Sequence, residues 1–162
     1  MTAKNTAVIF GKILATVDGS GLAEIAGYTA ADLAKKYSAS LAILYVAKYP
    51  KNLLGVSSSH TVEVGLPLSD PLADRLKQEA SASMNRIGEY ARNLDVEANQ
   101  EIIDTSSSIV GTIMDYVYRN NVDLIVMGSR GTNTFKTELI GSVSEGIFQG
   151  ARCAVMIVRR TF

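Results

Sequence analysis

The sequence contains a single cysteine and has no net charge. Each of these two features excludes a class of protein. Cys153 is the only cysteine, so an intrachain disulfide and zinc sites built from several cysteines are excluded. It precedes the apolar run 154–158, which favours a buried and unreactive thiol. Sixteen basic and sixteen acidic side chains cancel, so no overall field attracts nucleic acid or an anionic membrane.

Long hydrophobic runs are also missing from the sequence. No stretch approaches the ~18 consecutive apolar residues that a membrane-spanning helix needs. The apolar run from Ala7 to Phe10 is too short to be the core of a secretory signal. We therefore expect a cytoplasmic protein. With 47% hydrophobic and 20% charged residues, the 162 residues suit one ordinary globular domain that spans 1–162.

Catalytic and metal-binding residues do not occur in any familiar spacing. The sequence contains no G-x-S-x-G elbow, no paired histidine ligands and no Walker A loop. The only histidine, His60, has no acid or nucleophile at a meaningful spacing, so we interpret it as an exposed loop residue. Gly19 and Gly21 begin a dinucleotide motif, but Glu24 stands at its last glycine position and disfavours an NAD site. The sequence therefore predicts no catalytic residue and no protein ligand for a metal.

What the sequence does contain is a regular alternation of apolar strands with amphipathic helices. Helix starts are marked by Ser20, by Asp70 with Pro71, and by the serines at 106–108. The expected strands are 12–17, 41–46, 96–103, 124–128 and 154–158, and the expected helices are 22–37, 71–94, 109–120 and 142–150. This alternation predicts an α/β fold with a single doubly wound parallel sheet and helices on both faces. The more polar strand 96–103 is expected at a sheet edge.

Two stretches lack such a pattern. Residues 1–11 are interpreted as a loose N-terminal arm, and 47–69 as a long connecting loop of the kind that is usually functional or mobile. In the first two helices, residues that recur at helical spacing are expected to form the buried faces. They include Leu22, Ile25, Ala26, Thr29, Leu33 and Tyr37 in the first helix, and Leu72, Leu76, Ala80, Met84, Ile87, Ala91 and Leu94 in the second.

The richest functional signal is a glycine loop between a strand and a helix. The apolar strand 124–128 runs into Ser129-Arg130-Gly131, and nine residues later Gly141-Ser142 opens the next helix. Glycines let the backbone approach a ligand, and free N–H groups at a helix start attract an anion. Arg130 adds a fixed charge and a fork of donors suited to phosphate. The competing interpretation is a plain turn, with Ser142 as a helix cap.

Asp18 ends the first strand, directly before Gly19. The carboxyl ends of parallel strands meet at one edge of the sheet, and ligands bind there where the strand order reverses. Asp18 can accept hydrogen bonds from ribose hydroxyls or an adenine amine at that edge. It can equally be a simple turn residue.

These segments together resemble the universal stress protein family. The motif Gly128-Ser129-Arg130-Gly131, nine residues, Gly141-Ser142, with Val17-Asp18-Gly19-Ser20 after the first strand, is similar to the version in the family's ATP-binding branch, and the similarity runs from Lys12 to Arg159. The resemblance implies a five-stranded sheet of order 3-2-1-4-5, Rossmann-like and of the adenine nucleotide alpha hydrolase type. It also implies an ATP or AMP site. The implied contacts are Thr16, Val17 and Asp18 near ribose and adenine, Val46 at the adenine edge, Met127 and Gly128 beside the ribose, and Arg130, Gly131, Gly141, Ser142, Val143 and Ser144 around the phosphates.

The same resemblance implies a homodimer that pairs the last strands, Ala154 to Val158, and Mg²⁺ or Mn²⁺ carried with the nucleotide. The function it implies is that of a stress-response protein acting as a nucleotide-dependent sensor or switch. Two alternatives stay open at this point: a slow ATPase, and a dimeric interaction module with a vestigial pocket. The segment 47–69 either covers the nucleotide or contributes to the dimer.

Overall fold

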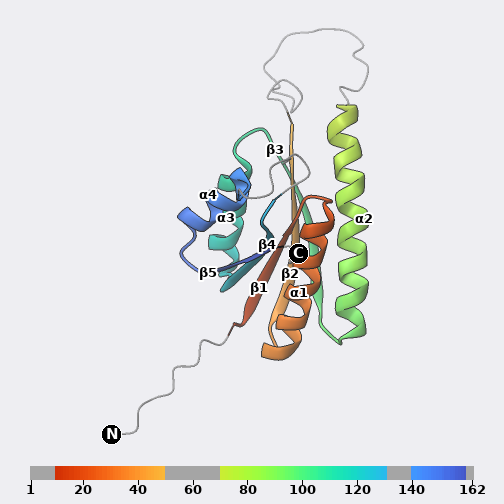
Figure 1. Ribbon diagram of the computed structural model, residues 1–162, viewed down its shortest axis with the longest axis vertical. Coiled ribbons are helices and arrows are strands. Elements are labelled where there is room, and N and C mark those ends of the chain that lie inside the picture. The colour runs from red at the N-terminus through yellow and green to blue at the C-terminus, as the bar shows by residue number, and fades with distance from the viewer. Residues whose placement is uncertain (1–9, 50–69, 131–139, 160–162) are drawn as a thin grey trace, which may run out of the picture.

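The computed structural model describes residues 10–49, 70–130 and 140–159, in which strands and helices alternate as predicted. The strands are β1 (Lys12–Val17), β2 (Ser40–Lys48), β3 (Ala98–Thr105), β4 (Leu124–Gly128) and β5 (Ala154–Val158). The helices are α1 (Gly21–Tyr37), α2 (Pro71–Asn93), α3 (Ile109–Asn120) and α4 (Ser142–Gly150). Figure 1 shows the sheet as a middle layer between two pairs of helices.

The sheet has five parallel strands in the order β3-β2-β1-β4-β5, which confirms the expected topology. β1 lies at the centre and pairs with β2 on one side and β4 on the other. Thr16 is aligned with both Leu44 of β2 and Met127 of β4. The strand order reverses between β1 and β4, so a crevice opens there at the carboxyl ends of the strands.

The two faces of the sheet bury separate clusters of side chains, and helices cover both faces as predicted. Ile13 and Val126 pack with α1 and α2, whereas Leu14 and Ile125 pack with α3 and α4. Strands buried on both faces explain the unbroken apolar runs in the sequence. Among the described residues, no helix has the length and apolar character to span a membrane.

Capping residues begin the first three helices where the sequence predicted. The Ser20 hydroxyl accepts from the backbone N–H of Ala23 at 3.2 Å, and that of Ser108 accepts from Gly111 at 3.2 Å. Asp70 caps α2 by accepting from two backbone N–H groups of its first turn. Side-chain caps of this kind satisfy helix donors that have no partner within the helix.

The buried face of α1 agrees only in part with the predicted one. Ala26 is buried and Leu33 and Tyr37 pack partly buried against the core, but Ile25 is 48% exposed. The other buried positions are small residues that were not predicted: Ala23, Gly27, Ala30, Ala31 and Ala34. The reason is close approach to α2, since a Cβ on Gly27 would lie only 2.3 Å from the Ile87 side chain. In α2 the predicted face is largely correct, but Leu72 is 65% exposed.

Several predicted boundaries are wrong by a few residues. The loop expected at 47–69 begins later, because Ala47 is buried and Lys48 still pairs with Thr105 of β3. The loose arm expected at 1–11 ends earlier. Phe10 packs edge-on against Tyr37, with ring centroids 5.1 Å apart. The remainder of both segments lies outside the described residues. The polar strand β3 lies at a sheet edge as predicted, although it starts two residues later than expected.

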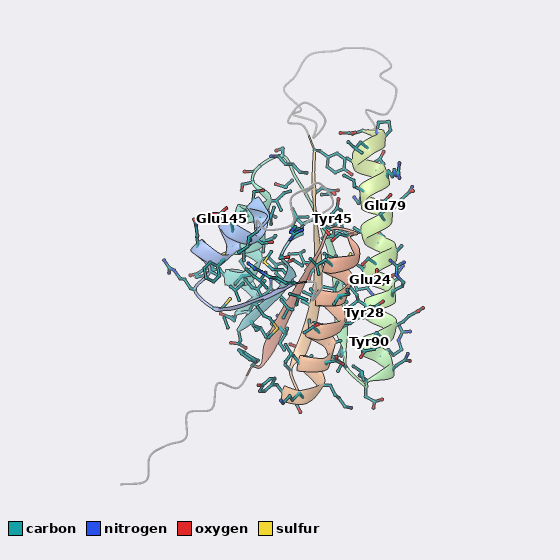
Figure 2. All side chains as sticks on the ribbon, viewed as in Figure 1. Glu24, Tyr28, Tyr45, Glu79, Tyr90 and Glu145 are labelled. Carbon is teal, nitrogen blue, oxygen red and sulfur yellow. The ribbon has the colours of Figure 1, made fainter. Side chains whose placement is uncertain are left out.

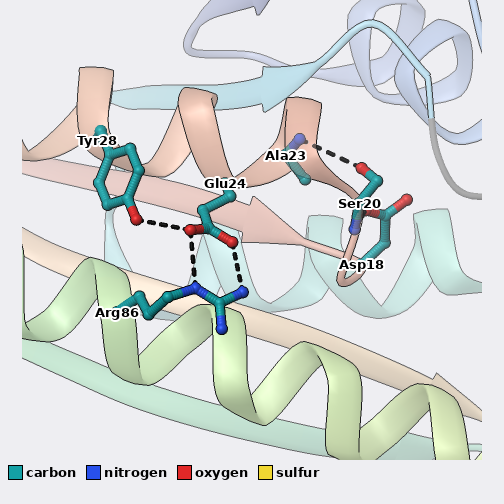
Figure 3. A network of polar contacts seen from close by, with 6 residues as sticks. All are labelled: Asp18, Ser20, Ala23, Glu24, Tyr28 and Arg86. Carbon is teal, nitrogen blue, oxygen red and sulfur yellow. Dashed lines mark hydrogen bonds and ion pairs between the residues drawn. The ribbon is translucent and has the colours of Figure 1, made fainter.

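A polar network joins α1 to α2 (Figure 3). The Arg86 guanidinium donates to both carboxylate oxygens of Glu24, at 2.8 and 2.6 Å, and the Tyr28 hydroxyl donates to the same carboxylate at 2.6 Å. The hydrogen bonds from Arg86, with that from Tyr28, lower the pKa of Glu24 from its usual 4.5 to about 2. The ionised form of Glu24 therefore stabilises the contact between the two helices.

We expect this network to make stability fall between pH 4.5 and 2. Because the pKa of Glu24 is lower in the folded state than in the unfolded state, its contribution is present above pH 4.5 and disappears as the pH falls through about 2. Allowing for solvent around Arg86, the contribution is about 1 to 2 kcal/mol. Urea denaturation should show Glu24→Gln less stable than the wild type at pH 7, with the two curves converging toward pH 2.5. A Glu89→Gln variant, which changes an exposed α2 carboxylate, serves as the control; an equal effect of both variants would contradict the prediction.

Candidate functional site

A pocket of about 380 Å³ opens at the carboxyl ends of β1, β2 and β4, at the place where the strand order reverses. Its walls come from the ends of these strands and from the first turns of all four helices. The lining residues are Thr16, Val17, Asp18, Ala23, Leu44, Tyr45, Val46, Lys48, Ala73, Leu76, Ile109, Ile113, Met127, Gly128, Arg130, Gly141, Ser142, Val143 and Ser144.

The structure brings together the residues that the family resemblance implied as nucleotide contacts. All of them line this pocket except Gly131, which lies outside the described residues. His60 lies outside them as well. In the described part of the chain, no group of three or more His, Cys, Asp or Glu side chains could hold a metal ion.

Backbone contacts close the base of the glycine loop. The N–H of Gly141 donates to the carbonyl of Ser129 at 2.8 Å, and the N–H of Ser129 donates to the carbonyl of Val158 in β5 at 2.9 Å. Gly128 is needed for close packing, because a Cβ there would lie 3.1 Å from the backbone nitrogen of Ala23 in α1. The two ends of the loop are thus fixed beside the start of α1 and the edge of β5.

The start of α4 lies at the pocket wall. Gly141, rather than Ser142, occupies the N-cap position, and no side chain of the described residues caps this helix. The first intrahelical bond is donated by Glu145 to the Gly141 carbonyl at 2.9 Å. The backbone N–H groups of Ser142, Val143 and Ser144 precede that bond and have no acceptor within the helix. Three donors and the positive end of the helix dipole therefore lie at the pocket wall.

The hydroxyl of Ser144 has a structural role that the sequence did not predict. It is buried and donates to the carbonyl of Gly128 at 2.8 Å. A hydroxyl has only one proton to donate, so this bond removes Ser144 Oγ as a donor to an anion. The bond instead ties the start of α4 to the end of β4, which fixes the direction of the backbone N–H groups.

Arg130 brings a buried donor to the same wall. Its Nε is enclosed by protein and has no hydrogen-bond partner among the described residues. A buried donor of a charged group without a partner is costly, and an anionic ligand would satisfy it. The Arg130 side chain and the three backbone N–H groups of α4 that lack intrahelical acceptors are donors of the kind that bind a negatively charged group.

Asp18 is a turn residue whose side chain also reaches the pocket. One carboxylate oxygen accepts from the backbone N–H of Ser20 at 3.0 Å, as a turn residue does. Gly19 has a φ of 85°, which favours glycine, and its α-carbon lies close to α2. Asp18 also lines the pocket, so the turn holds a carboxylate at the pocket wall.

The part of the pocket lined by α2 and α3, which we call its apolar end, has apolar side chains, and most of its residues were missed by sequence reasoning. Ala73 and Leu76 come from α2, and Ile109 and Ile113 come from α3. Tyr45 lies in the last half of β2 (Figure 2), and burial raises the pKa of its hydroxyl. Their position in the predicted fold could have identified them as pocket residues, because helices that run back along a parallel sheet begin near the edge where the strands end. Residues just after the caps Asp70 and Ser108 were therefore candidates.

A doubly wound parallel sheet with a pocket at its switch point is typical of the α/β proteins that bind ligands at the carboxyl ends of their strands. Residues 10–159 match the model of the universal stress protein family. The chain belongs to the universal stress protein family.

Two curated relatives show the extent of the similarity. Universal stress protein YxiE of Bacillus subtilis is 33% identical over 153 residues, which cover 93% of this chain and all of YxiE. Universal stress protein MJ0531 of Methanocaldococcus jannaschii is 27% identical over 100 residues, which cover 60% of this chain and 58% of that protein.

Solved structures share the fold. Hypothetical protein MJ0577 superposes with a TM-score of 0.73 at 23% identity, covering 95% of this chain and 99% of the other. A universal stress protein from Archaeoglobus fulgidus in complex with dAMP has a TM-score of 0.64 at 18% identity and covers 93% and 98% of the two chains. A universal stress protein in complex with cAMP has a TM-score of 0.62 at 17% identity, with 93% and 97% covered.

Proposed function

We propose that this protein binds an adenine nucleotide, ATP or AMP, in the pocket at the switch point of the sheet. The observation that carries the proposal is the set of donors in this pocket: three backbone N–H groups of α4 without intrahelical acceptors, and the Nε of Arg130, which has no partner among the described residues. Phosphates at this end satisfy those donors, and a purine ring suits the apolar end. Relatives of the same fold bind dAMP and cAMP, which supports this choice of ligand.

The proposed nucleotide lies along the crevice from α4 toward α2. In this arrangement Thr16, Val17 and Asp18 stand near the ribose and base, and the backbone of Val46 reaches the adenine edge. Met127 and Gly128 flank the ribose. The phosphates are surrounded by Arg130, Gly131, Gly141, Ser142, Val143 and Ser144, of which Ser144 acts through its backbone N–H.

A divalent cation, Mg²⁺ or Mn²⁺, fits this proposal only as a companion of the phosphates. Among the described residues, Asp18 is the sole carboxylate that lines the pocket, and one of its oxygens is already engaged. A single carboxylate is too few to make a protein cage for such an ion. The nucleotide oxygens and water would supply the remaining ligands.

Isothermal titration of the purified protein with ATP, ADP and AMP tests the proposal. We expect saturable binding of at least one of the three, with one nucleotide per chain. Mass spectrometry of the small molecules that copurify with the protein identifies the ligand taken up in the cell. A flat titration with all three nucleotides would remove the proposal.

We further propose that nucleotide occupancy, rather than turnover, is the signal, so that the protein acts as a stress-linked sensor or switch. A ligand shifts a protein between states only through different affinities for them. Hydrogen exchange of peptides that cover 130–141 should slow when ATP is added. Unchanged exchange at saturating ATP would contradict the switch. The cytoplasmic location expected from the sequence stays a prediction.

We also propose that two copies pair through β5 to form a homodimer. Among the described strands β5 pairs only with β4, so its other edge carries unpaired backbone groups. Met156, at the middle of β5, is 38% exposed. Across a two-fold axis the central residues of two antiparallel strands face one another, and like charges there repel.

Met156→Glu is therefore expected to weaken the dimer at least tenfold, an order-of-magnitude figure from the cost of opposed like charges. Sedimentation equilibrium measures the effect. Tyr118→Glu is the control, because it alters an 81% exposed side chain on α3, outside β5. A monomeric wild type, or equal dissociation of both variants, would contradict pairing through β5.

A further inference from the structure

The apolar end of the pocket is bounded by a helix that none of the proposed ligand contacts includes. Ala73 and Leu76, from the first two turns of α2, face the space that Ile109 and Ile113 of α3 close from the other face of the sheet. Neither α2 residue carries a polar group in its side chain. Their contribution depends only on how closely α2 approaches the ends of the strands.

An ion pair fixes this part of α2 to the sheet. The Lys77 ammonium donates to both carboxylate oxygens of Asp104, near the end of β3, at 2.9 and 3.1 Å. The same ammonium lies 5.9 Å from the centre of the Tyr49 ring. Tyr49 is anchored in turn, because its backbone N–H donates to the carbonyl of Thr105 at 2.8 Å. Lys77 directly follows Leu76 in sequence, so the anchor acts at the pocket wall itself.

The rest of α2 is held by contacts of a different kind, farther from the pocket. Ile87 packs against Gly27 of α1, and Arg86 binds Glu24. These contacts secure the middle of the helix, and the turn at Gly19 packs against Glu79 and Ala80. The Lys77–Asp104 ion pair links the second turn of α2 to β3. Loss of the Lys77–Asp104 pair would therefore act on the wall formed by Ala73 and Leu76 without loosening the core.

We propose that Lys77 and Asp104 are positioning residues that set the width of the base end of the pocket. They touch no ligand and act through Ala73 and Leu76. This inference rests on the proposed nucleotide site. It attributes the selectivity of that site for the base to the position of α2 against the sheet. The phosphate end, built from α4 and Arg130, is separate from this wall and keeps its affinity when the anchor is lost.

Titration of variants with two ligands tests the inference. Lys77→Met keeps the aliphatic stem beside Tyr49 and removes the charge. We expect its affinity for AMP to fall roughly two- to fivefold, the range for a partly exposed ion pair. The affinity for inorganic tripolyphosphate, measured by displacement of a fluorescent adenine nucleotide, should stay at the wild-type value. The charge-swapped double variant K77D with D104K should recover AMP affinity.

Arg75→Met is the matched control, since Arg75 pairs with Glu79 within α2 and not with the sheet. It should bind both ligands as the wild type does. Equal losses in Lys77→Met and Arg75→Met, parallel losses for AMP and tripolyphosphate, or no recovery in the charge swap would each overturn the inference. If the wild type binds no nucleotide, the proposed function and the inference are both wrong. If the wild type binds AMP and Lys77→Met binds it with the same affinity, only the inference is wrong.

Discussion

Replacing Arg130 with methionine is expected to weaken ATP binding by about 10- to 100-fold. Hydrogen bonds to a charged partner contribute about 1.5 to 3 kcal/mol, which corresponds to this range of affinity. The Nε of Arg130 is buried and has no partner among the described residues, so it is available to a phosphate oxygen. Adenosine, which lacks phosphate, should lose no more than about twofold, because a neutral ligand gains little from the guanidinium.

Titration calorimetry with ATP, AMP and adenosine measures these differences. Arg119→Met is the control, because Arg119 is an exposed arginine on α3 outside the pocket. Arg130→Lys should recover part of the ATP affinity, since lysine keeps the charge but loses the fork of donors. If Arg130→Met bound ATP as tightly as the wild type, the phosphates would have to lie elsewhere.

Gly128→Val should impair both stability and binding. A Cβ at this position would lie 3.1 Å from Ala23 N and 3.2 Å from the carbonyl carbon of Leu22, and these backbone atoms of α1 have little freedom to move. Overpacking of this kind costs about 2 to 3 kcal/mol. Displacement of the first turn of α1 also shifts a wall of the pocket, so we expect nucleotide affinity to fall roughly tenfold.

Chemical denaturation gives the change in the free energy of unfolding, and titration gives the change in affinity. Gly150→Val makes the same substitution at the end of α4, where a Cβ meets no atom within 4 Å. Its effect on stability should stay within about 0.5 kcal/mol. A Gly128→Val protein as stable as Gly150→Val would show that the approach of β4 to α1 does not require glycine.

The sheet could be predicted from the sequence because its inner strands are buried on both faces. Runs such as Leu124–Gly128 have no polar interruption, and helix caps such as Ser20 and Asp70 separate them from the helices. The face of α1 could not be predicted in this way. Helical periodicity predicts burial of large residues such as Ile25, whereas the close contact with α2 requires small residues such as Gly27 on the buried face.

The candidate site likewise has one part that could be predicted from the sequence and one that could not. The glycine loop, Asp18 and the start of α4 were predictable, because glycines, serines and an arginine after a buried strand have a chemistry of their own. The α2 wall was not, since Ala73 and Leu76 have ordinary apolar side chains, and only the fold brings them to the pocket. The hydrogen bond from Ser144 to the Gly128 carbonyl could not be predicted from the sequence for a similar reason. A serine at a helix start suits an anion and a backbone carbonyl equally well.

The central claim is that backbone donors at the start of α4 hold the phosphates of a nucleotide. Proton–nitrogen correlation spectra recorded during an ATP titration observe those donors one by one. We predict that the amides of Ser142, Val143 and Ser144 and the side-chain Nε–H of Arg130 shift most, and that all of them follow one saturation curve. Saturation with ATP that leaves these four signals in place would contradict the account.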